Sequence, residues 1–314
     1  RPTHTGAIQY TIEEIPTLGG SQNFAYAIND RGQVVGLSWL AGDTASAGFL
    51  YSSEQLTSLS PFNSGVVQTA GPTGINNRGQ IASGVIRNRL YTAGLYDSRN
   101  RQILPLGSLG GVCCDTFSGV ATAVNAGGAA VGYAYLDRMH PQAFLYSDGV
   151  MTDLASFGGW SRAFDINEDN EVVGAASDQV NGFARAFIYR DGVMTEIDPF
   201  GGGPDNESYA NGINGTGKVV GTGWVPSGGA FNAFIYSNGM SSNLGTLRGG
   251  INSEAYSIND RNQIVGIADK PYRTFCIDPD TGRKFRCVQY AQKGFLYQNG
   301  EMLDLNSLIK RNAG

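Results

Sequence analysis

The chain has 314 residues, of which 16% are charged and 45 are glycine. Its net charge of −5 and the scatter of its 22 basic residues exclude the concentrated cationic surface that a nucleic-acid partner requires. Glycine at about twice its usual share favours many tight turns between short strands, and no apolar stretch approaches the ~18 residues that span a bilayer.

One phrase recurs six times along the chain, and the same elements are predicted in the same order each time. A first strand that alternates small and bulky residues, such as 25–28, leads through an Asn-containing turn to a Val-Val-Gly strand, such as 34–36. A Phe-Leu-Tyr strand, such as 49–51, then leads through an Asp-Gly or Asn-Gly turn to a fourth strand, such as 151–154. The turn asparagines are Asn29, Asn76, Asn125, Asn167, Asn214 and Asn259.

Six such units predict an all-β fold, a β-propeller with one four-stranded blade of about 45 residues per repeat. We expect a single domain over residues 1–314. An extra copy of the fourth strand at Tyr10–Leu18 and the last strand at Met302–Leu308 are expected to close the propeller, and which of them does so stays open. The repeats are predicted near 21–59, 66–109, 117–157, 160–200, 204–247 and 251–308.

The third and fourth strands resemble a known family. The phrase Ala-Phe-Leu-Tyr, followed by Gly-x-Met-x-Asp-Leu and an end similar to Leu-Gly-Gly, is similar to the bacterial HAF repeat, and the resemblance covers about residues 10–308. The His that precedes Ala-Phe in that family is replaced here by Gln142, Arg185 and Asn232. The resemblance implies export and a propeller-like fold, and it implies no reaction and no catalytic residues.

Loops of variable length are predicted on one face of the propeller, and rigid scaffolds display binding residues on such loops. Three residues past the recurring Gly, the copies carry different side chains, and Trp160 follows a crossing between blades on the same face. The candidate ligand-binding residues are Trp39, Arg87, Tyr135, Trp160, Trp224 and Asp269. Their aromatic rings could stack on sugars or anchor a protein. The alternative is that they cover strand ends and pack against neighbouring blades.

The sixth repeat contains an insert over 267–294, in which 276–287 is predicted to form a small hairpin with a Pro-Asp-Thr-Gly turn. A disulfide between Cys276 and Cys287 would stabilise it by roughly 2–3 kcal/mol through loop closure. The alternative is a partner-binding finger whose cations are Arg283, Lys284 and Arg286.

Cys113 and Cys114 are adjacent, so their Cα atoms lie about 3.8 Å apart, below the usual disulfide range of about 4.4–6.8 Å. We expect a strained vicinal disulfide or free thiols, and pairing with Cys276 and Cys287 or between molecules stays open. No metal site and no cofactor are predicted, because the only histidines are His4 and His140 and no Cys-x-x-Cys motif occurs.

The sequence therefore predicts a non-enzymatic propeller that binds a glycan, a surface polymer or an extracellular protein through its variable loops. The even number of cysteines favours an oxidising compartment, so we expect an extracellular or cell-surface protein whose export signal has been removed. One alternative is a self-assembling subunit of an extracellular layer, sheath or appendage. Another is a hydrolase or lyase with its site at the channel mouth, although no Gly-x-Ser-x-Gly elbow supports it.

Overall fold

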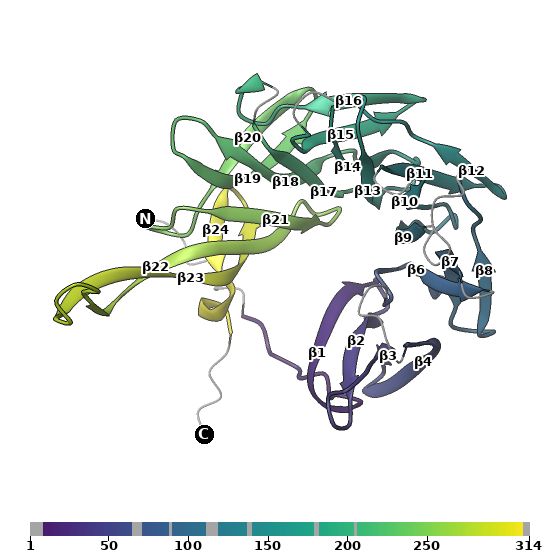
Figure 1. The fold of residues 1–314 in the computed structure, drawn as a ribbon, viewed down its shortest axis with the longest axis horizontal. Coiled ribbons are helices and arrows are strands. Elements are labelled where there is room, and N and C mark those ends of the chain that lie inside the picture. The colour runs from purple at the N-terminus through teal and green to yellow at the C-terminus, as the bar shows by residue number, and fades with distance from the viewer. Residues whose placement is uncertain are drawn as a thin grey trace, which may run out of the picture. The chain divides into compact units, whose positions relative to one another are not determined.

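Residues 9–64, 71–87, 90–110, 119–136, 140–178, 182–203 and 206–309 are described by the computed structural model of the chain. Each of the six repeats forms one antiparallel sheet of four strands, so the predicted six-bladed β-propeller is confirmed (Figure 1). In the described residues, each sheet takes its four strands in chain order, and helical structure is limited to short elements such as the 3-10 helix η2 (Leu305–Ser307). No helix among these residues is long and apolar enough to cross a membrane.

The blades follow one another along the chain. Blade 1 contains β1 (Gly19–Ile28), β2 (Val34–Leu40), β3 (Ser46–Ser52) and β4 (Gln55–Ser64). Blade 2 contains β5 (Gly74–Ile75), β6 (Gln80–Arg87), β7 (Leu90–Asp97) and β8 (Gln102–Pro105). Blade 3 contains β9 (Gly119–Val124), β10 (Ala130–Tyr135), β11 (Pro141–Ser147) and β12 (Val150–Asp153). Blade 4 contains β13 (Ser161–Ile166), β14 (Val172–Ala176), β15 (Arg185–Arg190) and β16 (Val193–Ile197). Blade 5 contains β17 (Ser208–Ile213), β18 (Val219–Val225), β19 (Ala230–Ser237) and β20 (Met240–Gly245). Blade 6 contains β21 (Ser253–Ile258), β22 (Ile264–Ile277), β23 (Lys284–Gln298) and β24 (Glu301–Asp304).

The chain divides into two compact units. Residues Glu14–Glu196 form the blade 1–4 unit. Residues Ile197–Gly314, together with Arg1–Glu13, form the blade 5–6 unit. Cys113 and Cys114 lie outside the described residues.

The two terminal strands differ from the prediction. Tyr10 and Leu18 each form one isolated parallel bridge, with Ile309 and Leu40 respectively, and the residues between them form no strand. Pro16 lies in this stretch and has no N–H to donate to a ladder. At the other end, β24 stops at Asp304 because the Asp304 side chain accepts a hydrogen bond from the Asn306 N–H and caps η2.

Bulky apolar side chains of the third strands fill the spaces between blades. Phe144 of blade 3 is fully buried in one cluster with Ala82 and Leu95 of blade 2. Phe187 of blade 4 lies in a cluster with Val131 of blade 3. The fully buried phenylalanines are Phe49, Phe144, Phe187, Phe234 and Phe295. Within each compact unit, successive blades thus bury their faces against one another, as expected for a repeat fold.

The glycine of the Val-Val-Gly phrase is required by a close approach of two strands. A β-bulge shifts the pairing of β10 with β9 between Val131 and Gly132. A Cβ added at Gly132 would lie 2.0 Å from the Val120 carbonyl oxygen. The same approach recurs at Gly36, Gly174, Gly221 and Gly266. In blade 2 the position is occupied by Ser83, and the first strand, β5, is only two residues long.

The turn asparagines connect successive blades. Their side-chain oxygens close their own turns, as the sequence indicates, and the side-chain nitrogens of Asn29, Asn76, Asn125 and Asn214 also donate to the next turn. Asn29 donates to the Asn76 carbonyl at 2.9 Å, Asn76 to Asn125 at 2.8 Å, and Asn125 to Asn167 at 3.0 Å. In the blade 5–6 unit, Asn214 donates to the Asn259 carbonyl at 3.2 Å. The recurring Asn therefore stabilises both the turn and the contact between blades.

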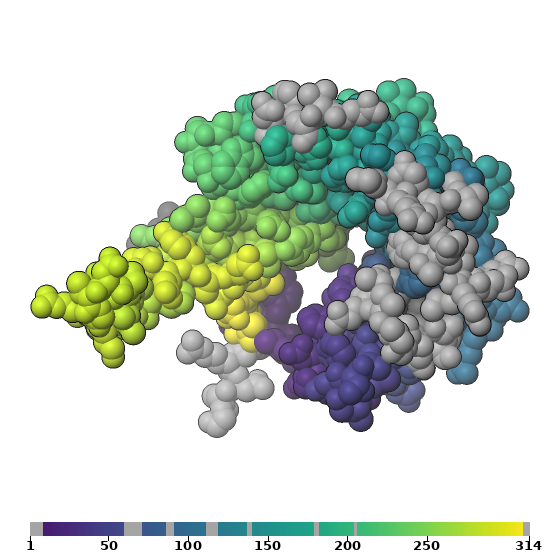
Figure 2. Space-filling model, in the orientation of Figure 1, coloured from purple at the N-terminus to yellow at the C-terminus, as the bar shows by residue number. Residues whose placement is uncertain are grey.

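The insert of the sixth repeat is a regular extension of its blade. The strands β22 and β23 pair without a bulge from Ile264 and Tyr297 to Ile277 and Lys284, and this ribbon, the arm, projects beyond the rest of blade 6 (Figure 2). The predicted Cys276–Cys287 disulfide joins its two strands, with Cα atoms 5.8 Å apart. At its base, Lys270 and Asp304 form an ion pair of 2.6 Å.

Candidate functional site

Four of the six binding residues predicted from the sequence occupy equivalent positions in their blades, and the six are divided between the two compact units. Trp39, Tyr135, Trp224 and Asp269 each lie ten residues after the turn asparagine of their blade. Arg87 lies one residue further along, because the equivalent position in blade 2 is Ile86, which pairs with Tyr91. Trp224 and Asp269 belong to the blade 5–6 unit, and Trp39, Arg87, Tyr135 and Trp160 belong to the blade 1–4 unit.

The two candidates of the blade 5–6 unit make structural contacts. The Asp269 carboxylate accepts hydrogen bonds from the backbone and side-chain nitrogens of Asn252, at 3.2 and 2.9 Å, and so closes the crossing between blades 5 and 6. The Trp224 ring packs edge-to-face on Phe231, its cross-strand partner, with centroids 5.2 Å apart. These contacts agree with the packing alternative for both residues.

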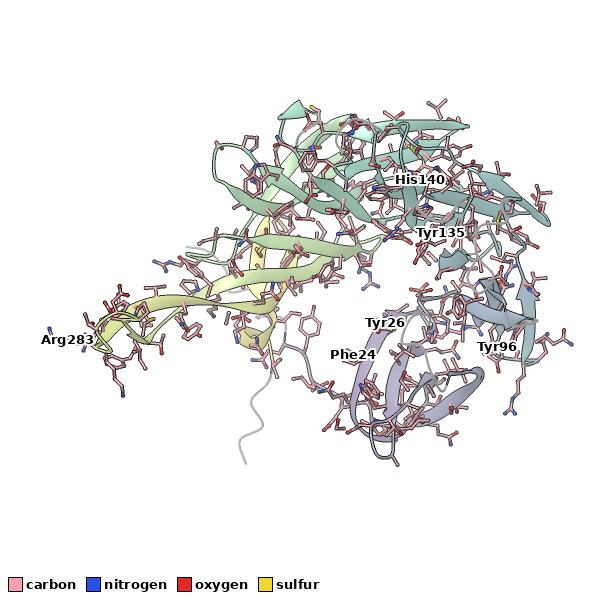
Figure 3. The ribbon with its side chains drawn as sticks, viewed as in Figure 1. Phe24, Tyr26, Tyr96, Tyr135, His140 and Arg283 are labelled. Atoms are coloured by element: carbon pink, nitrogen blue, oxygen red, sulfur yellow. A yellow bond between two sulfur atoms is a disulfide. The ribbon has the colours of Figure 1, made fainter. Side chains whose placement is uncertain are left out.

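Trp39 instead contributes to an open pocket of about 140 Å³ in blade 1. The blade 1 pocket is lined by Phe24, Tyr26, Leu37, Ser38, Trp39 and Ser46. Phe24 and Tyr26 project from the same part of β1 (Figure 3), and they are 49% and 52% exposed. Three aromatic rings and two serine hydroxyls therefore surround one hollow that solvent can reach.

Local strand geometry positions these side chains. Phe24 pairs with Leu37, and Trp39 pairs with Ser46, so β1, β2 and β3 all contribute to the same hollow. The pairing of β1 shifts between Ala25 and Ala27, which leaves Tyr26 at a bulge. Burial raises the pKa of Tyr26 above its ordinary value, so its hydroxyl stays protonated near neutral pH.

The back of the pocket is held by the segment that precedes β1. The Leu18 N–H donates to the Ser38 hydroxyl at 2.8 Å, which fixes β2 beside Trp39. Gly20 approaches the Trp39 backbone so closely that an added Cβ would lie 2.5 Å from it. The Gly-Gly pair at the start of β1 therefore allows close contact behind the indole.

Tyr135 and Trp160 lie in a second aromatic group, the tyrosine–arginine cluster, which consists of Tyr91, Tyr133, Tyr135, Trp160 and Arg162. The Arg162 guanidinium lies 4.9 Å from the centroid of the Tyr133 ring and 5.6 Å from that of Trp160. Tyr133 packs edge-to-face on Tyr135 at 6.0 Å. Since Arg162 lies on β13 and Tyr133 on β10, the cluster joins blade 4 to blade 3.

The buried tyrosines of this cluster resist ionisation. Burial, and then the neighbouring Tyr133, raise the pKa of Tyr91 above its ordinary value. Burial also raises the pKa of Tyr133, which Arg162 lowers and Tyr135 raises. Both hydroxyls therefore remain protonated at neutral pH and can donate hydrogen bonds.

These shifts predict a loss of stability in alkali. The unfolded chain ionises its tyrosines near pH ~10, before Tyr91 and Tyr133 ionise in the folded protein. The free energy of unfolding is therefore highest below that pH and falls as the pH rises above it. Tyr91→Phe is expected to reduce the slope of the unfolding free energy against pH by up to about 1.4 kcal/mol per pH unit. Urea titrations between about pH 10 and 11 measure the slope, and an unchanged slope would contradict the assignment.

The described residues contain no group of three or more His, Cys, Asp or Glu side chains that could hold a metal ion. The carboxylates near the Asn167 turn take part in hydrogen bonds of the fold. Glu168 accepts from the Ala126 N–H, and Glu171 accepts from the Asn167 side-chain nitrogen at 2.7 Å. We find no geometry there that would favour a cation.

Among known proteins, the chain matches a family that has no assigned activity. A family model described as "Protein of unknown function (DUF3466)" matches residues 152–313, just over half of the chain. No curated protein matches the chain.

The fold is similar to that of solved propellers. The propeller domain of the Trilobed protease from Pyrococcus furiosus, which has an open velcro topology, is 10% identical with a TM-score of 0.54, and the match covers 91% of this chain and 84% of that one. TolB from Acinetobacter baumannii is 13% identical with a TM-score of 0.51, covering 86% and 65%. An acylaminoacyl peptidase is 11% identical with a TM-score of 0.54, covering 92% and 46%, so this chain spans less than half of that enzyme. At such identities the likeness shows the fold alone.

Proposed function

We propose a binding function for this chain, which belongs to the DUF3466 family of proteins of unknown function. The proposed role is that of an exported, non-enzymatic propeller that binds a glycan at the blade 1 pocket. The observation that carries the proposal is the grouping of Phe24, Tyr26 and Trp39 around one solvent-accessible hollow on a rigid sheet.

The chemistry of the pocket suits a sugar ring better than a reaction. Half-exposed aromatic rings can stack on the apolar face of a sugar, and Ser46 adds a hydroxyl that can hydrogen-bond to it. The Ser38 hydroxyl is buried, accepts from the Leu18 N–H and donates to the Trp39 carbonyl, so it supports the pocket from behind. Among the described residues that line the pocket, the only ionisable group is the Tyr26 phenol, and a protonated phenol does not supply the paired acid and base that hydrolysis of a glycoside requires.

Export is supported by the Cys276–Cys287 disulfide, since such bonds persist in oxidising compartments. The resemblance to the HAF repeat, seen in the sequence alone, agrees with this location. The assembly and enzyme alternatives remain separate hypotheses. Light scattering of the dilute protein tests the first, and assays on ester, glycoside and phenol-oxidation substrates test the second.

The test of the binding proposal is a glycan array probed with the wild type and with Trp39→Ala. Loss of one stacking ring is expected to weaken the apparent affinity about tenfold. Trp224→Ala is the matched control, because its ring packs on Phe231 and lies outside the blade 1 pocket.

Equal retention by both variants would contradict the assignment of the pocket. A wild type that binds no glycan would contradict the proposed ligand class itself. Circular dichroism of both variants establishes that neither result comes from unfolding.

A further inference from the structure

The outer part of the arm exposes apolar side chains that no other element of the described residues covers. On one face of the ribbon, Phe275 is 66% and Ile277 64% exposed, and Val288 and Tyr290 are about half exposed. Soluble proteins seldom leave such side chains together in water, and patches of this kind mark interaction surfaces. The Cys276–Cys287 disulfide holds the two strands together at this point, so the exposed face keeps its shape.

Cationic side chains alternate with the apolar ones on the same face. Directly paired residues of a ribbon share a face, and every second residue returns to it. Arg273 therefore lies beside Val288, Phe275 beside Arg286 and Ile277 beside Lys284. We call this surface, which also includes Pro271 and Tyr290, the arm face. It carries three cations and no carboxylate.

The outer part of the arm, residues 270–293, has a charge opposite to that of the rest of the chain. Residues 270–293 contain six basic and two acidic side chains, a net charge of +4, whereas the whole chain carries −5 and the remainder therefore −9. One of the two acids, Asp278, has its carboxylate occupied by the N–H groups of Asp280 and Thr281 in the turn. The arm is thus a local cationic and apolar element on an acidic protein.

We propose that the arm face binds the surface of an anionic phospholipid bilayer. Phe275, Ile277 and Val288 would be buried at the boundary between headgroups and acyl chains, and Arg273, Lys284 and Arg286 would pair with lipid phosphates. The length of the face, seven paired positions at about 3.3 Å each, allows it to lie flat on the headgroup layer.

Other occupants fit less well. A second copy placed face to face would bring three cations against three like charges, which opposes a symmetric pair. A polysaccharide would find few stacking surfaces, since Ile277 and Val288 are aliphatic and have no ring face. A bilayer buries aliphatic and aromatic side chains without requiring a matched shape.

The experiment is co-sedimentation of the full chain with phosphatidylcholine vesicles, either pure or containing about 30% phosphatidylglycerol. We expect binding to the anionic vesicles alone and release at high salt. Arg273→Gln/Lys284→Gln/Arg286→Gln is expected to weaken binding about 100-fold, since each cation near an anionic surface contributes about 1 kcal/mol. Phe275→Ser/Ile277→Ser is expected to weaken it at least about tenfold.

Matched controls lie elsewhere on the chain. Arg31→Gln/Arg248→Gln/Arg261→Gln makes the same change in net charge at other exposed positions. Val150→Ser/Val193→Ser removes two valines that are 62% and 61% exposed. Both controls are expected to bind as the wild type does.

Three results would overturn the proposal: no binding of the wild type to anionic vesicles, equal losses in the arm variants and their controls, or binding to an acidic polysaccharide such as alginate in place of vesicles.

Discussion

Gly132→Ala is expected to lower the free energy of unfolding by about 3 kcal/mol, because the new methyl group has no room. Its Cβ would lie 2.0 Å from the Val120 carbonyl oxygen and 2.9 Å from the Ala121 Cα, so the backbones of β9 and β10 must separate. The bulge beside Gly132 and the buried cluster that includes Ala121 would both be disturbed. Urea denaturation followed by circular dichroism measures the change.

Gly228→Ala is the matched control. An added Cβ at Gly228 would meet only the Val225 side chain, at an ordinary distance of 3.8 Å. Its effect is expected to stay within about 0.5 kcal/mol. If Gly132→Ala is as stable as Gly228→Ala, the recurring glycine serves some purpose other than close approach.

Asn125→Ala is expected to cost about 3 kcal/mol, since it removes the buried hydrogen bonds that join blade 3 to blade 4. The Asn125 side-chain nitrogen donates to the Asn167 carbonyl at 3.0 Å and to the Asn170 side-chain oxygen at 2.9 Å. Its side-chain oxygen accepts from the Ala129 N–H at 3.0 Å. After substitution the buried Ala129 N–H lacks its side-chain acceptor and the buried Asn167 carbonyl loses one of its donors, where water reaches poorly. The same urea titration measures the loss.

Asn259→Ala is the control that measures the contribution of the turn alone, without a hydrogen bond between blades. Asn259 closes the equivalent turn by accepting from the Arg261 and Gln263 N–H groups, both at 3.0 Å, but it is exposed and its side-chain nitrogen donates within its own turn, to Gln263. Its loss is expected to cost about 1 kcal/mol. Equal effects at the two positions would show that the turn, and not the contact between blades, explains the recurring Asn.

The fold was predictable because each blade repeats the same local signals. The Asn turn, the Val-Val-Gly strand and the Asp-Gly turn specify short antiparallel strands wherever they occur, and stacking follows because no blade can bury its own faces. Blade 2 departs from the phrase at Ser83, and its first strand, β5, has only two residues. The regular extension of β22 and β23 goes beyond the prediction, which placed only a small hairpin over 276–287 within the insert.

The candidate site was predictable only in part. Trp39 was a candidate because the side chain at its position changes between blades, although blade 5 carries the equivalent Trp224, and it lines the blade 1 pocket. Phe24 and Tyr26 were missed, because bulky residues on a first strand indicate packing. A signal existed at the bulge: Thr73 and Thr122 donate to the backbone of the following blade, whereas Tyr26 occupies the same position in blade 1. The repeat gives the place of each residue within its blade, but it does not show that Phe24, Tyr26 and Trp39 surround the same pocket.

The most direct test of glycan binding uses Trp39 as its own reporter. In a Trp160→Phe/Trp224→Phe protein, Trp39 is the only indole of the chain. Titration with a glycan that the array identifies should change its fluorescence saturably, with a midpoint that matches the affinity measured by calorimetry. Calorimetric saturation without any change in Trp39 emission would place the ligand elsewhere and contradict the assignment of the blade 1 pocket.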